Sequence, residues 1–377
     1  MSWSLQQLGP YVSQSLGVPY ERLLEAFRPA TEADLPRILE LRRLVSGGGM
    51  WWDDESFVRW RYFNSQLATH PTPYWVFERE NEIIGGMGLE PVVLVVDGEA
   101  QPATRTLDIM VRPDFDGRGL GALMNLVIFE HYPITLVTGS NARSHKLISR
   151  MFEQALDLRV WKTLVRSRDF IERQAKLGPL TRVAATAGDA LLALERARRR
   201  RRPPPSLELR ELNEFDDDVT ALSRASEGQG RILVRRSPEY LNWRFVRNPR
   251  CRYRIHGGFV SGRLVGYVVT RLNLARPNSR KEGDIADWLA LPSIEDGVSP
   301  LFFIMHAAVD QLIHDGARLV RCLAYGTTVA PMIEAAGFRP RADERLPFFV
   351  RASTGTLHKR LASGEGWFLT GCDFDVE

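Results

Sequence analysis

The sequence of 377 residues contains only three cysteines, Cys251, Cys322 and Cys372, and they lie far apart. An odd number of cysteines without a CxxC pair excludes a disulfide framework and a common type of zinc site, and it favours a reducing compartment. No apolar run approaches the ~20 residues that a membrane helix needs. The first residues also lack the basic and apolar regions of a signal peptide. We therefore expect a cytoplasmic protein with no metal site and no membrane span.

An excess of charge of one sign is also missing. The formal net charge is +4, and six positive charges come from Arg196 and the run Arg198–Arg202. The rest of the chain is close to neutral, which excludes a broad nucleic-acid-binding face. The content of 44% hydrophobic and 25% charged residues is typical of a globular protein. The length predicts two domains, each with its own core.

What the sequence does contain is an internal repeat. Segments of the first half recur in the second half at an almost constant offset of 179 to 183 residues, which indicates two copies of one fold. The matched segments are Phe27–Leu44 with Leu209–Ser226, Phe57–Phe63 with Tyr240–Val246, Ile84-Gly85 with Val265-Gly266, and Asp108 and Pro113 with Asp287 and Pro292.

Each copy has the same expected order of elements. A strand and a helix come first, then a helix with a Trp-Arg-aromatic triplet, then three strands; a helix, strand, helix and strand complete the first copy. This order predicts an α/β protein with two tandem domains, each a mixed, mostly antiparallel sheet flanked by helices. The expected division is a helical extension (1–26), a first domain (27–172), an arginine- and proline-rich linker (173–206) and a second domain (207–377). The arginines of the linker could touch an anionic surface or a partner, but a solvated linker helix is the favoured interpretation.

The strongest local signal is the stretch VRPDFDGRGLGAL at Val111–Leu123. Gly117, Gly119 and Gly121 lead into an apolar helix, whose first N–H groups are unpaired and carry partial positive charge. Glycines let the backbone come close to an anion, so the geometry suits a pyrophosphate. The stretch is not a P-loop, because no Lys-Ser/Thr follows, and it lacks the GxGxxG spacing of a dinucleotide-binding fold.

In this context the sequence resembles the GNAT acyltransferase superfamily, whose signature is a strand with V-x-P, then R/Q-x-x-G-x-G/A and a helix. Val111 and Pro113 match the V-x-P, Gly119 and Gly121 match the motif glycines, and Asn141 resembles the asparagine before the family's next helix. The resemblance covers roughly residues 27–170 and 207–375. The tandem arrangement is similar to that of a two-copy subgroup of the family. It implies acetyl-CoA or another acyl-CoA as co-substrate and no metal.

The resemblance also implies which residues hold the cofactor and the oxyanion. A backbone N–H of the strand before the loop, within Ile109–Val111, would stabilise the oxyanion of the thioester. Asp116 departs from the family pattern, where arginine or glutamine is usual; it could instead cap the helix. The implied cofactor-binding residues are Ile109, Met110, Val111, Asp116, Gly117, Arg118, Gly119, Leu120, Gly121, Ala122, Asn141, Arg143 and Lys146, and Arg112 could add positive charge.

The second copy lacks the glycine ladder. Only Gly297 occurs in the corresponding stretch, beside Glu295 and Asp296. We therefore expect a degenerate second domain that shapes the acceptor site or completes the fold, and one active site per chain.

Three residues are candidates for acid–base catalysis: Asp108 on the strand before the loop, His145 after Asn141, and Glu90 near the expected acceptor cleft. Asp108 has a counterpart in Asp287 of the second copy, so the alternative to catalysis is that Asp108 serves folding. The position where many family members have a tyrosine acid is Ile148 here. Trp51 and Trp52 have no counterpart in the second copy and are candidates for substrate binding, with core packing as the alternative.

The leading hypothesis is an acyl-CoA-dependent N-acyltransferase, expected to use acetyl groups, that acts by direct transfer in a ternary complex. The acceptor would be an amine of a small molecule such as an amino sugar or a secondary metabolite. A non-catalytic CoA-binding protein and a FemAB-like peptidyl transferase are the alternatives. The oligomeric state stays open.

Overall fold

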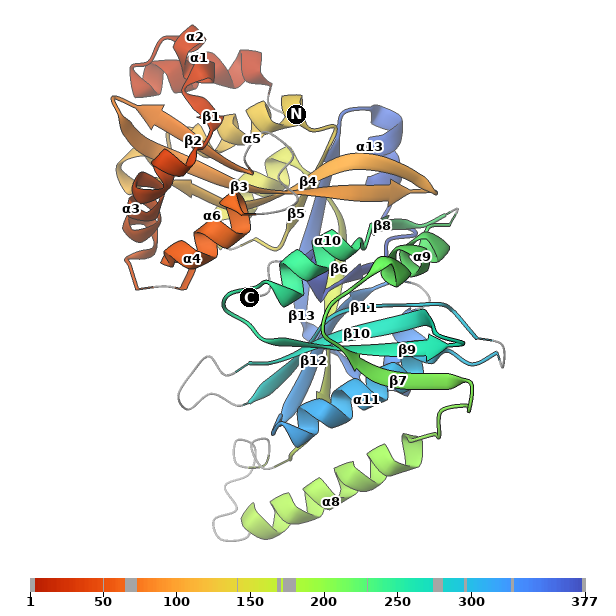
Figure 1. Ribbon diagram of the computed structural model, residues 1–377. Helices are drawn as coiled ribbons and strands as arrows, with labels where there is room; N and C mark the ends of the chain where they lie inside the picture. The colour runs from red at the N-terminus through yellow and green to blue at the C-terminus, as the bar shows by residue number, and fades with distance from the viewer. Residues whose placement is uncertain are drawn as a thin grey trace.

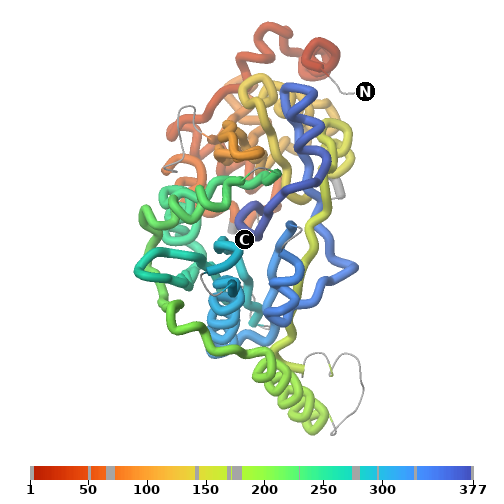
Figure 2. The backbone as a smooth tube through the Cα atoms, turned by 90° about the vertical axis from the view of Figure 1, so that its right-hand side faces the viewer, coloured from red at the N-terminus to blue at the C-terminus, as the bar shows by residue number. Residues whose placement is uncertain are grey.

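The computed structural model describes residues 4–49, 51–64, 73–140, 142–167, 171, 181–228, 230–273, 281–294, 297–326 and 329–374. Two helices, α1 (Leu5–Leu16) and α2 (Tyr20–Glu25), precede the first strand and pack at one end of the molecule, whereas α8 (Thr181–Arg199) lies at the other end (Figure 2). Between them the strands form one continuous sheet with helices on its faces (Figure 1).

The first half follows the order expected from the sequence. Its strands are β1 (Phe27–Pro29), β2 (Tyr74–Arg79), β3 (Glu82–Val96), β4 (Glu99–Val111), β5 (Ile134–Thr138) and β6 (Glu153–Leu164). Its helices are η1 (Glu32–Asp34), α3 (Leu35–Ser46), η2 (Trp51–Asp53), α4 (Glu55–Val58), η3 (Arg59–Phe63), η4 (Pro113–Phe115), α5 (Leu120–His131) and α6 (Ala142–Met151).

The second half repeats these elements and adds a C-terminal piece. Its strands are β7 (Leu207–Leu212), β8 (Ile232–Val234), β9 (Tyr253–Val260), β10 (Arg263–Asn273), β11 (Glu282–Ala290), β12 (Leu319–Tyr325) and β13 (Arg339–Ala352). Its helices are α9 (Asp217–Ser226), α10 (Pro238–Leu241), η6 (Asn242–Val246), α11 (Pro300–His314) and α12 (Val329–Ala335). The added piece consists of α13 (Gly355–Ala362), β14 (Leu369–Thr370) and η7 (Gly371–Asp373).

The two copies exchange their last strands. In the part of the chain that the structure describes, the sheet has 14 strands, with the main order β1-β2-β3-β4-β5-β13-β6-β12-β11-β10-β9-β7. Strand β13 of the second half pairs with β5 of the first, and β6 of the first half pairs with β12 of the second. Among the described ladders only β4–β5 and β11–β12 are parallel. The mixed, mostly antiparallel α/β fold is therefore confirmed, but its two sheets are joined into one, and the domain boundaries stay a prediction.

The hydrophobic core also joins the two halves. One large cluster contains the aromatic side chains of both triplet helices, among them Trp60 and Trp243. A second cluster lies between α1, α5, α6 and the first strands, and it contains Leu8 and Val12 of α1 and Leu123 and Met124 of α5. No helix among the described residues is long and apolar enough to cross a membrane. The N-terminal helices thus belong to the packing around the glycine loop.

Candidate acyl-CoA site

The glycine loop begins helix α5 with a row of unpaired backbone donors. Gly117 and Gly119 have φ angles of 75° and 80°, a left-handed conformation that glycine adopts without strain. Gly119 is the N-cap of α5 and has no side-chain cap. Within the described chain, the N–H groups of residues 117 to 122 donate to no backbone carbonyl oxygen. Such a row at a helix N-terminus is suited to bind a phosphate group.

Two helices hold this loop in place. On the side of α1, a Cβ on Gly119 would lie 3.1 Å from Val12 Cγ2, and Arg118 donates to the carbonyl oxygen of Ser15 at 3.2 Å. On the side of α6, a Cβ on Gly121 would lie 3.5 Å from Leu147 Cδ2. The loop is therefore a rigid part of the fold and its backbone donors are already oriented.

The charged neighbours of the loop include one arginine that is already paired. Arg112 is bound by Asp114 at 2.8 Å and by Glu82, so its charge is largely balanced by these carboxylates. Asp116 is exposed and lies three residues before Gly119, the N-cap of α5. Its role as a cap of this helix stays a prediction.

Next to the loop, β4 and β5 separate. Their parallel ladder contains only the pairs Thr104–Thr135 and Arg105–Leu136. Farther along, Arg112 donates its N–H to Ile84 on β3 at 2.9 Å, so the alternation of the strand turns the N–H of Val111 toward the open edge. The stretch Ile109–Val111 is half-buried. It therefore presents backbone donors beside the loop, as an oxyanion site requires.

Asp108 lies on a β-bulge at this edge. Its φ is 47°, and the register of β4 against β3 shifts at this point. The carboxylate oxygen Oδ2 accepts hydrogen bonds from Tyr62 at 2.6 Å and from Arg42 at 3.1 Å. The Asp108 side chain is 21% exposed, whereas Arg42 is buried. Burial works to raise the pKa of Asp108, but the charges of Arg42 and Arg61 and the Tyr62 hydrogen bond outweigh it and hold that pKa below its ordinary value.

Two glycines of β3 make this arrangement possible. A Cβ on Gly88 would lie 2.3 Å from the Tyr62 hydroxyl, and a Cβ on Gly86 would lie 2.7 Å from the Tyr74 hydroxyl. The tyrosine rings therefore lie directly over the β3 backbone. Tyr62 was missed as a site residue in the sequence, although one signal was present: its counterpart Phe245 lacks the hydroxyl.

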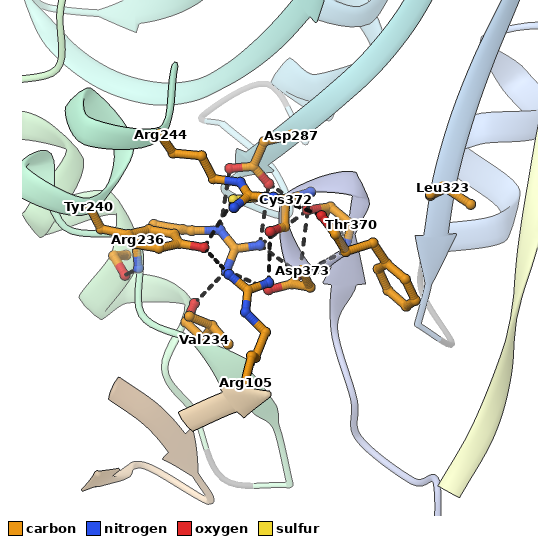
Figure 3. Close-up of polar contacts among 12 residues, drawn as sticks. Arg105, Val234, Arg236, Tyr240, Arg244, Asp287, Leu323, Thr370, Cys372 and Asp373 are labelled. Carbon is orange, nitrogen blue, oxygen red and sulfur yellow. Dashed lines mark hydrogen bonds and ion pairs between the residues drawn. The ribbon is translucent and has the colours of Figure 1, made fainter. Parts of the chain in front are cut away.

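In the second half, the space between β11 and β12 that corresponds to the opening between β4 and β5 is closed. The C-terminal strand β14 pairs with β12 through Ala324–Thr370, and a Cβ on Gly371 would lie 2.7 Å from the carbonyl oxygen of Ala286 on β11. Asp287 is fully buried there and accepts a hydrogen bond from Thr370 at 2.5 Å (Figure 3). The loop differs as well, because Gly297 donates its N–H to Ile294. This geometry supports the interpretation of a degenerate second copy.

Glu90 lies in a buried cluster between the halves. Its side chain is 3% exposed, accepts a hydrogen bond from Tyr240 at 3.0 Å, and pairs with Arg244 at 3.3 Å, with Arg61 at 3.6 Å and with Arg105. Burial alone would raise the pKa of Glu90, but the three guanidinium groups outweigh it and lower the pKa to about 2. This geometry favours a structural role for Glu90 over a catalytic one.

The other candidates lie around the opening. His145 on α6 is exposed and shares a hydrogen bond of 2.9 Å with Ser140, and Lys146 is exposed. Trp52 is half-buried, and its carbonyl oxygen accepts from Arg42 Nε at 2.6 Å, which ties η2 to Asp108. Asn141 and the side chains of Trp51 and Arg143 lie outside the described residues. Among the residues that are described, no cluster of His, Cys, Asp or Glu could hold a metal ion.

Comparison with known proteins agrees with this geometry. Residues 35–157 match the model of the acetyltransferase (GNAT) family. This match contains the glycine loop, Asp108 and Glu90. A comparison with curated protein sequences gives no match.

Several solved structures share the fold. A GCN5-related N-acetyltransferase from Anabaena variabilis is 14% identical with a TM-score of 0.57 and covers 87% of this chain and 72% of its own. One from Kribbella flavida is 13% identical with a TM-score of 0.55, covering 86% and 71%. N-myristoyltransferase of Saccharomyces cerevisiae with bound myristoyl-CoA is 12% identical with a TM-score of 0.52, covering 86% and 78%.

Proposed function

We propose that the first half binds acetyl-CoA or another acyl-CoA and transfers the acyl group directly to an amine of a small molecule, such as an amino sugar or a secondary metabolite. The observation that carries the proposal is the row of N–H groups at residues 117–122 that donate to no backbone carbonyl oxygen of the described chain, directly beside the open edge of β4. The pyrophosphate would bind these donors. The acyl chain would enter where β4 and β5 separate.

In this arrangement the thioester carbonyl lies against the stretch Ile109–Val111, where the N–H of Val111 would stabilise the oxyanion of the tetrahedral intermediate. The amine would approach from the side of Asp108. Tyr62 and Arg42 both bind Oδ2, and Oδ1 has no partner among the described residues, so it is available to the amine. We assign Asp108 the role of holding the amine and accepting its proton, while the thiolate of CoA leaves.

Two further groups complete the proposal. The exposed imidazole of His145 is the candidate for protonating the thiolate, because it lies on the helix that contacts the glycine loop. Trp52 lies on the acceptor side, since Arg42 connects its carbonyl oxygen to Asp108. The pair Trp51-Trp52 would therefore form a wall of the acceptor site.

Calorimetric titration with acetyl-CoA tests the binding step. Gly117→Ala places a Cβ on a left-handed residue of the loop and should weaken binding at least tenfold, because the N–H groups lose their common orientation. Gly297→Ala is the matched control: its φ of 70° is similar, and the space around both positions is open. Equal binding by the two variants, or no binding by the wild type, would contradict the proposal.

Release of free thiol with a panel of small amines tests the transfer step. We expect release with the wild type and a loss of at least ~100-fold in kcat/KM for Asp108→Asn. Binding of acetyl-CoA without thiol release for any amine would instead support the non-catalytic alternative. Transfer from aminoacyl-tRNA without acetyl-CoA binding would support the FemAB-like one.

A further inference from the structure

A second cavity lies far from the glycine loop, at the end of the molecule where α8 crosses the second half. It has a volume of about 820 Å³ and is lined by α8, α11, the ends of β6 and β12 and the turn into β13. Figures 1 and 2 show α8 at this end, next to α11 and opposite the N-terminal helices. The strands that the two halves exchange therefore end at this cavity.

The lining of this cavity is strongly basic. Eight arginine or lysine side chains but only three carboxylates line it. Each carboxylate is already paired with a cation of the same cavity, in the pairs Lys162–Glu344, Arg199–Glu195 and Arg200–Asp310. Arg166, Arg196 and Arg339 have no carboxylate partner among the described residues. Several guanidinium groups around one space repel each other unless an anion binds between them.

The arginines of α8 are held toward this cavity. Asp189 of α8 accepts hydrogen bonds from the N–H and the hydroxyl of Ser167, at 2.6 and 2.9 Å. Arg199 donates to the carbonyl oxygen of Glu334 at 3.1 Å. The linker helix is thus bound to both halves. Arg196 and Arg199 are half-buried, whereas Arg198 is exposed.

The same cavity also has an apolar floor. Val309 and Ile313 of α11 and Leu192 of α8 line it together with the cations. His306 lines it as well, and its buried Nε2 has no hydrogen-bond partner among the described residues. A volume of this size matches a molecule as large as a nucleotide. Guanidinium groups bind phosphate oxygens in pairs and stack on flat rings, so both parts of such a molecule find suitable contacts.

We infer that this cavity is a second ligand site, which takes a phosphate-bearing organic molecule of nucleotide size. Arg166, Arg196 and Arg339 would bind the phosphate oxygens, and the apolar floor would contact the organic part. The site is separate from the glycine loop and does not depend on the proposed acyl transfer.

Calorimetric titration with inorganic pyrophosphate and with ADP at fixed ionic strength tests this inference. The double variant Arg196→Gln/Arg339→Gln should bind both probes at least tenfold more weakly. The matched control is Arg198→Gln/Arg202→Gln, which removes the same charge from exposed positions in and just after α8 that do not line the cavity. It should bind like the wild type. Both double variants are compared in the Gly117→Ala background, so that pyrophosphate bound at the glycine loop does not contribute to the difference.

Arg166→Gln is a second variant, because this side chain is exposed and lies outside α8, so that a loss of helix docking does not confuse the result. It should weaken pyrophosphate binding severalfold. Absence of binding by the wild type, or an equal loss in the control double variant, would overturn the site. Binding of ADP no tighter than that of pyrophosphate would overturn the organic part of the assignment.

Discussion

Trp60 and Trp243 donate their indole N–H groups to each other's backbone carbonyl oxygens, at 3.1 and 3.2 Å. Their rings stack with centroids 5.1 Å apart and an angle of 18°. Each tryptophan lies in a five-residue π-helical turn, Arg59–Phe63 or Asn242–Val246. The two copies of the repeat therefore meet through equivalent residues, and the Trp-Arg-aromatic triplet is the contact that relates them.

Replacing either tryptophan of this pair with phenylalanine should lower the free energy of unfolding by about 1–2 kcal/mol beyond the loss of volume, because a buried carbonyl loses its donor. Trp161→Phe is the control, since the indole N–H of the buried Trp161 has no partner among the described residues. Urea unfolding of the single and double variants measures the difference. Equal costs for Trp60→Phe and Trp161→Phe would contradict a stabilising role of the reciprocal bonds.

Asp108 and Asp287 occupy equivalent positions but should respond differently to substitution by asparagine. Asp287 is fully buried against Arg236 and Tyr267, so Asp287→Asn should cost about 3–5 kcal/mol of stability. Asp108→Asn changes a partly exposed carboxylate and should mainly reduce acyl transfer. Thermal melts and thiol-release kinetics on both variants separate the effects. If Asp287→Asn were folded but inactive and Asp108→Asn were active, the active site would have to be assigned to the second half.

The buried carboxylate of Glu90 should make stability depend on pH in the acidic range. Its pKa in the folded state is about 2, below the ordinary value of 4.5, because the charges of Arg105, Arg244 and Arg61 outweigh the effect of burial. A group with a lowered folded pKa contributes stability above its unfolded pKa and loses it as the pH falls toward the folded pKa. The shift corresponds to about 3 kcal/mol.

Unfolding in urea at several pH values between 7 and 2 measures this contribution. The cost of Glu90→Gln should be constant above pH 5 and should shrink between about pH 4.5 and 2, where the wild-type carboxylate becomes protonated. A cost that stays the same across this range would show that the charge of Glu90 does not contribute.

Gly88→Ala should disturb the site through Tyr62. The new Cβ would lie 2.3 Å from the Tyr62 hydroxyl, so the ring has to move away from Asp108. We expect a loss of about 1–3 kcal/mol from overpacking and an activity as low as that of Tyr62→Phe. Gly228→Ala is the control, because the space around Gly228 is open. Urea unfolding and thiol release on the three variants test this; normal activity in Gly88→Ala would contradict the role of Tyr62.

Much of the fold could be predicted from short stretches of sequence. The repeat, the strand β2 and the helix after the glycine loop are visible because alternating or helical patterns of apolar residues and turn-forming glycines act locally. The same holds for the loop itself, since the left-handed conformation of Gly117 and Gly119 depends on their lack of a Cβ.

The site was predictable only in part. Asp108 lies at the open edge, as the order of motifs indicated, but its partners Tyr62 and Arg42 are 46 and 66 residues away in the chain. Glu90 has the sequence context of an acceptor-site residue, yet it is buried among arginines from both halves. No local sequence pattern predicts contacts between residues so far apart in the chain, because these ion pairs depend on which elements pack together.

The sequence by itself determined the elements, their repetition and the glycine loop, because these depend on neighbouring residues. The tertiary structure alone decided the rest. It exchanged β6 and β13 between the copies, closed the second gap with β14, and collected the arginines of α8 around a cavity. Each of these outcomes depends on contacts between segments far apart in the chain, whose free energy of packing is not encoded in either segment alone.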